Sequence, residues 1–240
     1  MTPTVFELRR YRLRPGAREP MIDLFDREFV ETQEACGMAI LGQFRELGDP
    51  DAFVWMRGFA DRAARRSALE RFYGGPVWAE HAPAARATMV NTADALLLRP
   101  AAGGPLAPPP GPRAAPGAAA PAAGLLRCTT WHPVPGREAE VAALHRDRIA
   151  PLLAQGPGRL LAAWERDPAP NDFAPLPVRP DPVFVTLEAF ADAPELALTE
   201  GLEGGELWRE EIGPQLDRLC WRPARRLILA PTARSAWRGV

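Results

Sequence analysis

The sequence predicts an α+β protein built from two tandem ferredoxin-like domains. Three observations support this fold class. The first 100 residues follow the order strand, helix, strand, strand, helix, strand, which gives an antiparallel sheet covered by helices on one face. A stretch made almost entirely of Pro, Ala and Gly follows. Turns and aromatic residues of the first part then recur in the second part at a nearly constant distance.

The elements of the first part are predicted from local patterns. Alternating runs of β-branched and aromatic residues predict strands over 5–11, 38–45, 53–59 and 95–99. Apolar residues at helical spacing and local end signals predict helices over 18–35, 61–72 and 76–90. Asp61 is a favourable N-cap, Pro76 suits the first turn of a helix, and Gly37 suits a helix end.

The second part repeats the first. Tyr11 corresponds to Trp131 at a distance of 120 positions, and Trp78 corresponds to Trp208 at 130. The change in distance follows an insertion rich in Pro and Asp, residues 167–181. We therefore divide the chain into a first domain (1–100), a linker (101–123), a divergent second domain (124–232) and a C-terminal tail (233–240).

The composition excludes several classes of function. The chain has 240 residues, a formal net charge of -1 and 47% hydrophobic residues, so we expect a globular protein without attraction to nucleic acid or membranes. All of its basic side chains are arginines, so it has no Schiff-base or P-loop lysine. We expect no secretory signal and no membrane span, because the first residues and the apolar runs lack the required patterns.

The cysteines and histidines predict neither a disulfide framework nor a metal site. Cys36, Cys128 and Cys220 lie far apart, which favours the reducing cytoplasm. The three histidines have no metal-ligand spacing, and we expect neither a metal nor another cofactor.

The strand pattern predicts which side chains face the helices, although a shift of one residue would reverse the assignment. One consistent choice packs six apolar residues on the helices: Phe6, Leu8, Ile40, Phe44, Val54 and Met56. The other face then lines a partly polar cavity between two sheets with Glu7, Arg9, Tyr11, Gln43, Arg45, Trp55 and Arg57. Opposite charges at matched positions predict two ion pairs across a pseudo-twofold axis, Arg45 with Glu165 and Arg57 with Glu188. A solvated or salt-bridged face is the alternative.

Four stretches of the first part resemble a NIPSNAP-family domain of the dimeric α/β-barrel superfamily. They are Phe6–Tyr11, Gly42–Arg45, Phe53–Phe59 and Phe72–Trp78, the last followed by His81. The resemblance implies two ferredoxin-like units packed sheet to sheet in a barrel, either within one chain or between chains of a homo-oligomer. The second part resembles the family only in outline, because Glu211 stands where His81 would recur. A site is therefore expected in the first copy.

Two residues of that copy are candidate catalytic groups. His81 is a candidate acid or base, since imidazole titrates near neutral pH, and Tyr73 offers a phenol. The alternative roles are structural: His81 supports the Gly-Gly-Pro turn, and Tyr73 packs on the sheet.

Five further residues are candidate ligand contacts. Trp55 and Trp78 are suited to wall an apolar pocket, Arg45 and Arg57 to hold a carboxylate, and Gln43 to orient a carbonyl group. Core packing and cross-sheet ion pairs explain the same residues equally well.

Two functions follow as hypotheses, and the sequence does not decide whether the chain is an enzyme. The first is a cofactor-independent enzyme that acts on a small aromatic or polyketide-like molecule in a barrel cavity. The alternative is a non-catalytic module that binds an apolar molecule or haem, or that mediates protein association. A cavity with His81 pointing into it favours the first, and a filled barrel with His81 turned outward favours the second.

Overall fold

The computed structural model describes residues 2–118 and 123–239. The first half contains β1 (Val5–Leu13), α1 (Arg18–Leu24), the π-helix η1 (Phe25–Phe29), α2 (Val30–Ala35), β2 (Ala39–Glu46), β3 (Ala52–Phe59), α3 (Arg62–Tyr73), α4 (Pro76–Thr88) and β4 (Met89–Pro100). The second half contains β5 (Leu125–Pro133), α5 (Glu138–Leu144), η2 (His145–Ile149), α6 (Ala150–Leu153), β6 (Arg159–Arg166), β7 (Phe184–Phe190), α7 (Ala193–Glu203), η3 (Trp208–Ile212), α8 (Gly213–Leu219) and β8 (Cys220–Pro231).

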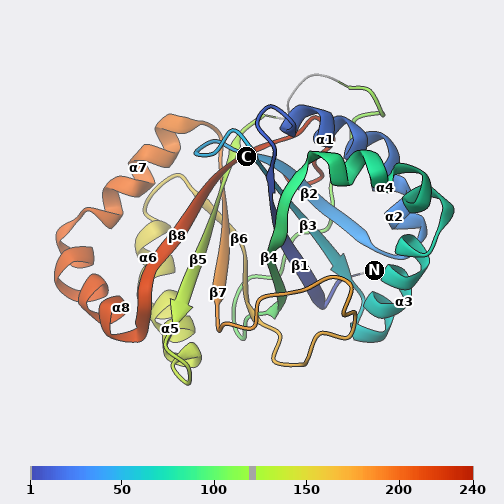
Figure 1. The fold of residues 1–240 in the computed structure, drawn as a ribbon. Coiled ribbons are helices and arrows are strands. Elements are labelled where there is room, and N and C mark those ends of the chain that lie inside the picture. The colour runs from blue at the N-terminus through green and yellow to red at the C-terminus, as the bar shows by residue number, and fades with distance from the viewer. Residues whose placement is uncertain (1, 119–122, 240) are drawn as a thin grey trace.

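The eight strands form one closed antiparallel barrel in the order β1-β3-β2-β8-β5-β7-β6-β4. Each half contributes a four-stranded sheet, and the halves join where β2 pairs with β8 and β4 pairs with β6. The helices of each half cover the outside of its own sheet (Figure 1). The predicted α+β fold of two ferredoxin-like halves is confirmed, and both halves of the barrel come from one chain.

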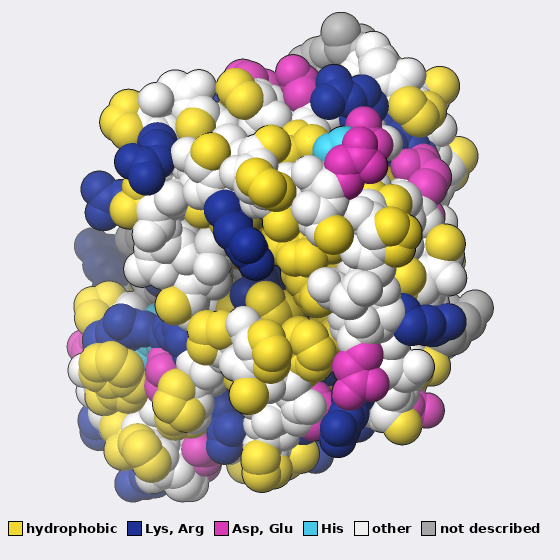
Figure 2. All heavy atoms as spheres, turned by 45° about the vertical axis from the view of Figure 1, so that its right-hand side comes forward, with side chains coloured by type: hydrophobic (Ala, Val, Ile, Leu, Met, Phe, Trp, Pro, Cys, Tyr) yellow, Lys and Arg dark blue, Asp and Glu magenta, His cyan; other side chains and the backbone are white. Residues whose placement is uncertain are grey.

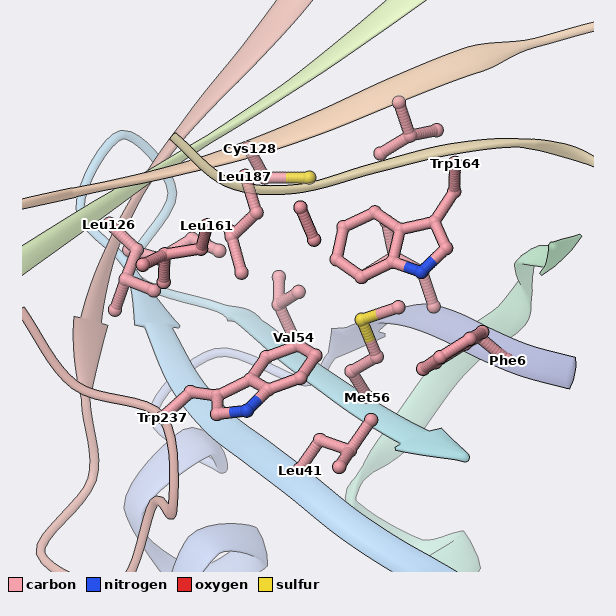
Figure 3. Close-up of a cluster of buried hydrophobic side chains, with 14 of the residues drawn as sticks. Phe6, Leu41, Val54, Met56, Leu126, Cys128, Leu161, Trp164, Leu187 and Trp237 are labelled. Atoms are coloured by element: carbon pink, nitrogen blue, oxygen red, sulfur yellow. The ribbon is translucent and has the colours of Figure 1, made fainter. Parts of the chain in front are cut away.

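The barrel interior is filled by apolar side chains from both halves. Phe6, Val54 and Met56 meet Trp164 and Leu187 there, and all five are almost fully buried. Figure 3 shows these residues converging on the centre together with Trp237 of the C-terminal tail. The predicted cavity between the sheets is therefore wrong, because interdigitated side chains occupy that space.

The predicted assignment of strand faces was reversed for most positions. Phe6, Leu8, Phe44, Val54 and Met56 point into the barrel rather than toward the helices. The candidates on the opposite face of these strands lie on the helix side: Glu7, Arg9, Tyr11, Gln43, Trp55 and Arg57 are buried there, and Arg45 is partly exposed. Both faces of the sheet are buried, so the alternation of residues carried no signal of direction.

Ile40 alone among the six apolar residues faces the helices as predicted. The pairing of β2 with β3 shifts between Ile40 and Gly42, and this bulge separates Ile40 from the residues that follow it on the strand. A Cβ at Gly42 would overlap the ring of Phe44, so a larger residue at this position would displace that buried ring.

The two ion pairs predicted across the pseudo-twofold axis are also wrong. Arg57 pairs with Glu7 of the neighbouring strand, and Glu188 pairs with Arg127. Arg45 pairs with Glu19, while Glu165 pairs with Arg99. Each charge finds a partner within its own half or at the β4–β6 joint, because the barrel interior between matched positions is apolar.

The predicted linker and tail lie together against one region of the barrel. Most described residues of 101–118 are exposed, yet the Pro108 carbonyl accepts a hydrogen bond of 3.0 Å from the Trp237 indole. Arg234 of the tail pairs with Glu31. The domain boundaries at 100, 123 and 232 stay a prediction, and residues 119–122 and 240 lie outside the described residues.

No helix within residues 2–118 and 123–239 has the length and apolar character that crossing a bilayer requires.

Candidate functional site

The stretch Phe72–Trp78 forms the corner between α3 and α4. Its two glycines make a turn in which a Cβ at Gly75 would lie 2.7 Å from the Arg71 carbonyl oxygen, so a larger residue does not fit without movement. Pro76 begins α4, as its fixed φ favours. The corner places the rings of Tyr73 and Trp78 edge to face, with centroids 4.9 Å apart.

A pocket of about 580 Å³ opens beside this corner, on the outer side of the barrel wall. Its lining is mostly aromatic and apolar and consists of Tyr11, Glu70, Tyr73, Gly74, Trp78, Arg86, Met89, Thr92, Phe173, Pro175 and Leu176. Figure 2 shows hydrophobic side chains gathered in a hollow on the face that carries the first half of the chain. The pocket therefore lies between the sheet and α3–α4, outside the filled barrel.

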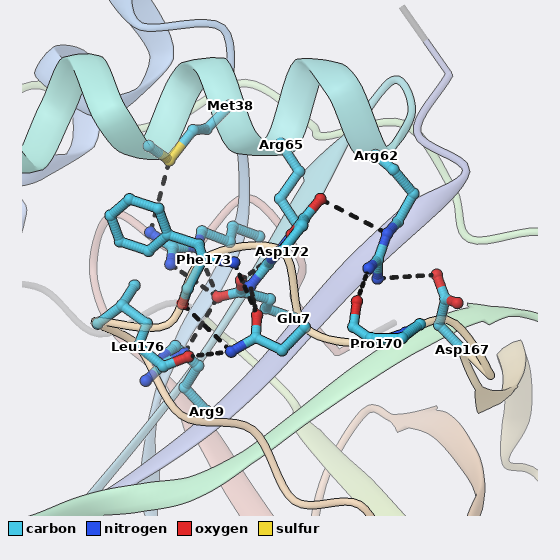
Figure 4. A network of polar contacts seen from close by, with 12 residues as sticks. Glu7, Arg9, Met38, Arg62, Arg65, Asp167, Pro170, Asp172, Phe173 and Leu176 are labelled. Carbon is cyan, nitrogen blue, oxygen red and sulfur yellow. Dashed lines mark hydrogen bonds and ion pairs between the residues drawn. The ribbon is translucent and has the colours of Figure 1, made fainter.

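The insertion of the second half covers one side of this pocket. Phe173 lies 6.0 Å from the ring of Tyr73, between ring centroids. Arg65 of α3 pairs with Asp172 and donates a 3.2 Å hydrogen bond to Asn171. Figure 4 shows the insertion running past Arg62 and Arg65 of α3, with Phe173 and Leu176 on the same segment. The second half thus completes a site that the first half begins.

A buried ionic cluster lies beneath the helices, next to the pocket. Arg57 donates to the Glu7 carboxylate at 2.7 Å and to the side-chain amide oxygen of Gln33 at 2.8 Å. Arg65 approaches the other oxygen of Glu7 at 2.6 Å, and Arg9 approaches Glu7 at 3.2 Å (Figure 4). Glu7 and the three arginines have fully buried side chains.

This cluster carries an excess of positive charge. Three arginines, Arg9, Arg57 and Arg65, face two carboxylates, Glu7 and Asp172. Burial alone would raise the pKa of Glu7, but the three arginines outweigh it and hold that pKa far below its usual range. One positive charge therefore remains uncompensated within the cluster.

Two features connect the cluster to the pocket. Arg57 lies over the ring of Tyr73, 5.9 Å from its centroid, and Arg9 lies over the ring of Tyr11 at 5.8 Å. The buried Arg9 Nε has no hydrogen-bond partner among the described residues. Burial raises the pKa of Tyr73, although Arg57 opposes that shift, so the phenol stays protonated at neutral pH.

The structure brings part of the predicted site together. Tyr73 and Trp78 line the pocket, and Arg57 lies directly behind Tyr73. Trp55 lies one layer deeper, where its ring packs edge to face on Tyr11 at 5.9 Å. These four positions share one corner of the first half.

The other three predicted residues lie elsewhere. His81 approaches Glu28 at 3.5 Å and packs against Phe29, and it does not line the pocket. Gln43 is buried beside Asp26, with 3.4 Å between the amide nitrogen and the carboxylate oxygen. Arg45 forms its ion pair on the surface. A ligand in this pocket would not contact any of these three side chains.

Sequence reasoning missed the residues that give the site its charge and its cover. The predicted strand orientation places Glu7 and Arg9 on the face between the sheets, and Arg65 of the predicted helix 61–72 has no predicted role. The insertion was detected only as a change of register between the repeats. Its aromatic Phe173 and acidic Asp172, within a Pro-rich segment, were the available signal that it folds onto another part of the chain.

The second half does not reproduce this site. Arg127 stands 120 positions after Glu7 and pairs with Glu188 at 2.8 Å and with Glu203 at 3.1 Å. Arg226 also pairs with Glu203 at 2.7 Å, so two arginines face two carboxylates and this cluster has no excess positive charge. Glu211, at the position matching His81, pairs with Arg148.

A closed barrel of two ferredoxin-like halves, with the helices on its outside, has the dimeric α/β-barrel fold. Solved structures with this fold align with the whole chain. An anthrone oxidase-like protein aligns with a TM-score of 0.64 at 12% identity, covering 99% of this chain and 95% of its own. A proposed monooxygenase from Fusobacterium nucleatum aligns with a TM-score of 0.61 at 9% identity, covering 100% and 97%. A proposed monooxygenase from Lactobacillus acidophilus aligns with a TM-score of 0.57 at 9% identity, covering 99% of this chain and 98% of its own. At these identities the likeness shows the fold alone.

Residues 6–105 match the NIPSNAP family model, so the first half of the chain is similar to a NIPSNAP domain. The matched range begins in β1 and ends just after β4, so it contains every residue that the first half contributes to the pocket. A search of curated proteins found no significant match to the sequence.

Proposed function

We propose that the NIPSNAP-like half binds a flat aromatic molecule with an acidic oxygen, such as a phenol, in the pocket beneath the insertion. The observation that carries this proposal is the pairing of aromatic walls with a buried arginine cluster behind them. This location replaces the barrel cavity of the sequence-based hypothesis.

The pocket walls suit a flat apolar ring system. Tyr73 and Trp78 form one side, and Phe173 and Leu176 of the insertion form another. Aromatic pairs prefer edge-to-face or offset contacts at the centroid distances found here, so a ring between them would gain similar contacts. A volume of about 580 Å³ falls in the range of small-molecule sites.

The charge behind the walls favours an acidic oxygen. The uncompensated positive charge of the arginine cluster lies beside Tyr11 and Tyr73, so it stabilises a phenolate more than a neutral hydroxyl group. The protonated Tyr73 phenol can donate a hydrogen bond to the same oxygen.

A second candidate function is oxidation of the bound molecule by dioxygen. The same positive charge would favour the ionised form of a phenol, which gives up an electron to dioxygen more readily than the neutral form. The names of the structural neighbours, which are proposed monooxygenases and an anthrone oxidase-like protein, support this candidate. His81 has no place in such a reaction, because it lies outside the pocket lining.

Calorimetric titration of the full chain with 2-naphthol tests the binding proposal. We expect binding that Trp78→Leu weakens by about tenfold, the loss expected for removing one aromatic wall. Trp208→Leu, at the matching position of the second half, is the control and should leave the affinity unchanged. Equal effects of the two variants, or no binding at all, would overturn the proposal. Oxygen uptake with 2-naphthol bound would support oxidation, and its absence leaves binding as the function.

A further inference from the structure

A second pocket of about 580 Å³ lies where β5, β8 and the insertion meet. It is lined by His132, Arg179, Asp181, Trp221, Arg222, Pro223, Ala224 and Arg225. It shares no lining residue with the pocket beside Tyr73. The resemblance of the first half to NIPSNAP domains also does not reach it, because β5 and β8 lie outside residues 6–105.

The pocket contains two buried hydrogen-bond donors without acceptors. His132 is 1% exposed, and its Nδ1 lies 3.1 Å from Arg222 Nη2. Because a guanidinium group can only donate, Nδ1 accepts this hydrogen bond, and the neutral ring carries its proton on Nε2. Neither His132 Nε2 nor Arg222 Nε has a partner among the described residues. Leaving buried donors unpaired is unfavourable, so an acceptor from a bound molecule is expected at this pocket.

The charges around the pocket leave one arginine uncompensated. Arg225 pairs with Asp94 at 2.7 Å, and Arg179 pairs with Asp94 at 2.9 Å and also with Asp181. Arg222 has no carboxylate within ion-pair distance among the described residues. Three arginines thus face two carboxylates, and the excess positive charge lies on the arginine that also has the unpaired nitrogen.

We propose that this pocket binds a small organic carboxylate. The excess charge of Arg222 matches the single negative charge of a carboxylate group, and its Nε–H offers a charge-assisted donor to a carboxylate oxygen, while His132 holds the guanidinium in place by accepting from Nη2. A phosphate dianion fits less well, because Asp181 also lines the pocket and would repel the second charge. Trp221 is 53% exposed at the rim and offers a flat surface to the apolar part of the ligand.

The state of His132 supports this assignment. Burial and the neighbouring positive charge of Arg222 together lower the pKa of His132 to about 4. The imidazole is therefore neutral at pH 7 and keeps the donor on Nε2. A protonated ring would instead put an Nδ1–H donor against an N–H donor of Arg222, which the 3.1 Å contact does not allow.

Titration calorimetry with sodium benzoate, on the full chain, tests the proposal. Benzamide has the same shape without the charge, and inorganic phosphate tests the preference among anions. We expect benzoate to bind and benzamide to bind at least about tenfold more weakly, because benzamide loses the charge-assisted hydrogen bonds. Arg222→Gln should weaken benzoate binding by a similar factor. Arg209→Gln, which removes an exposed arginine outside the pocket, should leave it unchanged.

Two further variants locate the bound benzoate. His132→Phe should weaken binding, and thermal unfolding monitored by circular dichroism shows whether that variant folds; Arg222→Gln carries the test if it does not. Trp78→Leu should leave benzoate binding unchanged, so failure of this proposal is distinguishable from failure of the phenol site. The proposal is overturned if benzoate does not bind, if Arg222→Gln has no effect, if Trp78→Leu abolishes binding, or if phosphate binds more tightly than benzoate.

Discussion

Glu7 holds three buried arginines in place beneath α2 and α3, and it is the residue on which the aromatic pocket most depends. Its two oxygens bind Arg57, Arg65 and Arg9, and no other carboxylate of the cluster is fully buried. Such a cluster is not a simple source of stability, because burying each charge is costly. Its value here is that it fixes the arginines behind Tyr11 and Tyr73.

Glu7→Gln should destabilise the protein by about 3–5 kcal/mol, because it leaves three buried arginines without their shared anion. Urea unfolding at pH 7 measures this change. Glu140→Gln, which removes an exposed partner of Arg137, is the control and should change the unfolding free energy little. A loss for Glu7→Gln no larger than that of the control would contradict the role assigned to the cluster.

The difference in unfolding free energy between the natural protein and Glu7→Gln should depend on pH. The folded-state pKa of Glu7 lies below the ordinary value of 4.5, so its ionisation stabilises the fold fully above pH 4.5. That contribution is lost as the pH falls from 4.5 toward the lower folded-state pKa. The difference in unfolding free energy between the natural protein and Glu7→Gln should therefore shrink on acidification, and a difference that grows would contradict the lowered pKa.

His81→Ala should leave the affinity for 2-naphthol within about twofold of the natural protein. The reason is geometric: His81 faces Glu28 and Phe29 and lies outside the pocket lining. Calorimetry under the conditions used for Trp78→Leu checks this expectation. A large loss of affinity would mean that His81 contacts the ligand and that the ligand does not lie in the pocket described here.

Residue types in the site were recognisable from the sequence, but their directions were not. Tyr73 and Trp78 stood out because they flank a Gly-Gly-Pro turn, and both line the pocket. The directions of the strand side chains were predicted wrongly because both faces of this sheet are buried, one by helices and one by the opposite sheet. Glu7 and Arg57 pointed to a polar environment, and the sequence did not reveal that Arg65 and Gln33 of the helices supply it.

At the scale of elements, the insertion between β6 and β7 distinguishes this chain from a simple repeat. Its Asp167 and Asp172 pair with Arg62 of α3, and Arg179 pairs with Asp94 of β4. These pairs hold a segment of the second half across the first. The insertion lines both pockets described above, one through Phe173 and the other through Arg179.

Phe173→Ala should weaken 2-naphthol binding by about threefold to tenfold, the loss expected for one aromatic contact. Phe173 contributes a wall of the pocket and packs on Tyr73. Leu198→Ala removes an apolar side chain that is 66% exposed on α7 and serves as the control. Unchanged affinity in Phe173→Ala would mean that the insertion does not cover the ligand.

Element type was predictable for most of the first half, whereas lengths depended on tertiary pairing. Residues 18–35 form one continuous helical segment, as predicted, with the π-helical turn η1 in its middle. β4 begins at Met89 rather than at Ala95, because Asn91 and Asp94 pair with β1 despite a sequence typical of a loop. Such residues enter a strand when a neighbouring strand offers its backbone groups.

At the scale of the whole molecule, two sheets close on a shared core that no single half possesses. Trp164 from the second half packs on Phe6 from the first at 5.6 Å, and Trp237 of the tail stacks on Trp164 at 6.0 Å. The core fills the barrel interior, and neither pocket shares a lining residue with it. The sequence repeat predicted the paired halves, and only the packing revealed that their shared interior is apolar.

Trp237→Ala should destabilise the protein by about 3–5 kcal/mol, as expected when a large aromatic side chain is removed from a packed core. Urea unfolding measures the loss, and Trp221→Ala, which truncates an exposed tryptophan, should cost much less. A small effect of Trp237→Ala would mean that the tail is not part of the barrel core.

The most direct test of the account is a crystal structure of the full chain with 2-naphthol bound. We predict the aromatic ring between Trp78 and Phe173, with its oxygen on the side of Tyr73 and Arg9, and an undisturbed barrel core. Finding the molecule inside the barrel, in space that Trp237 or Trp164 had vacated, would contradict the account.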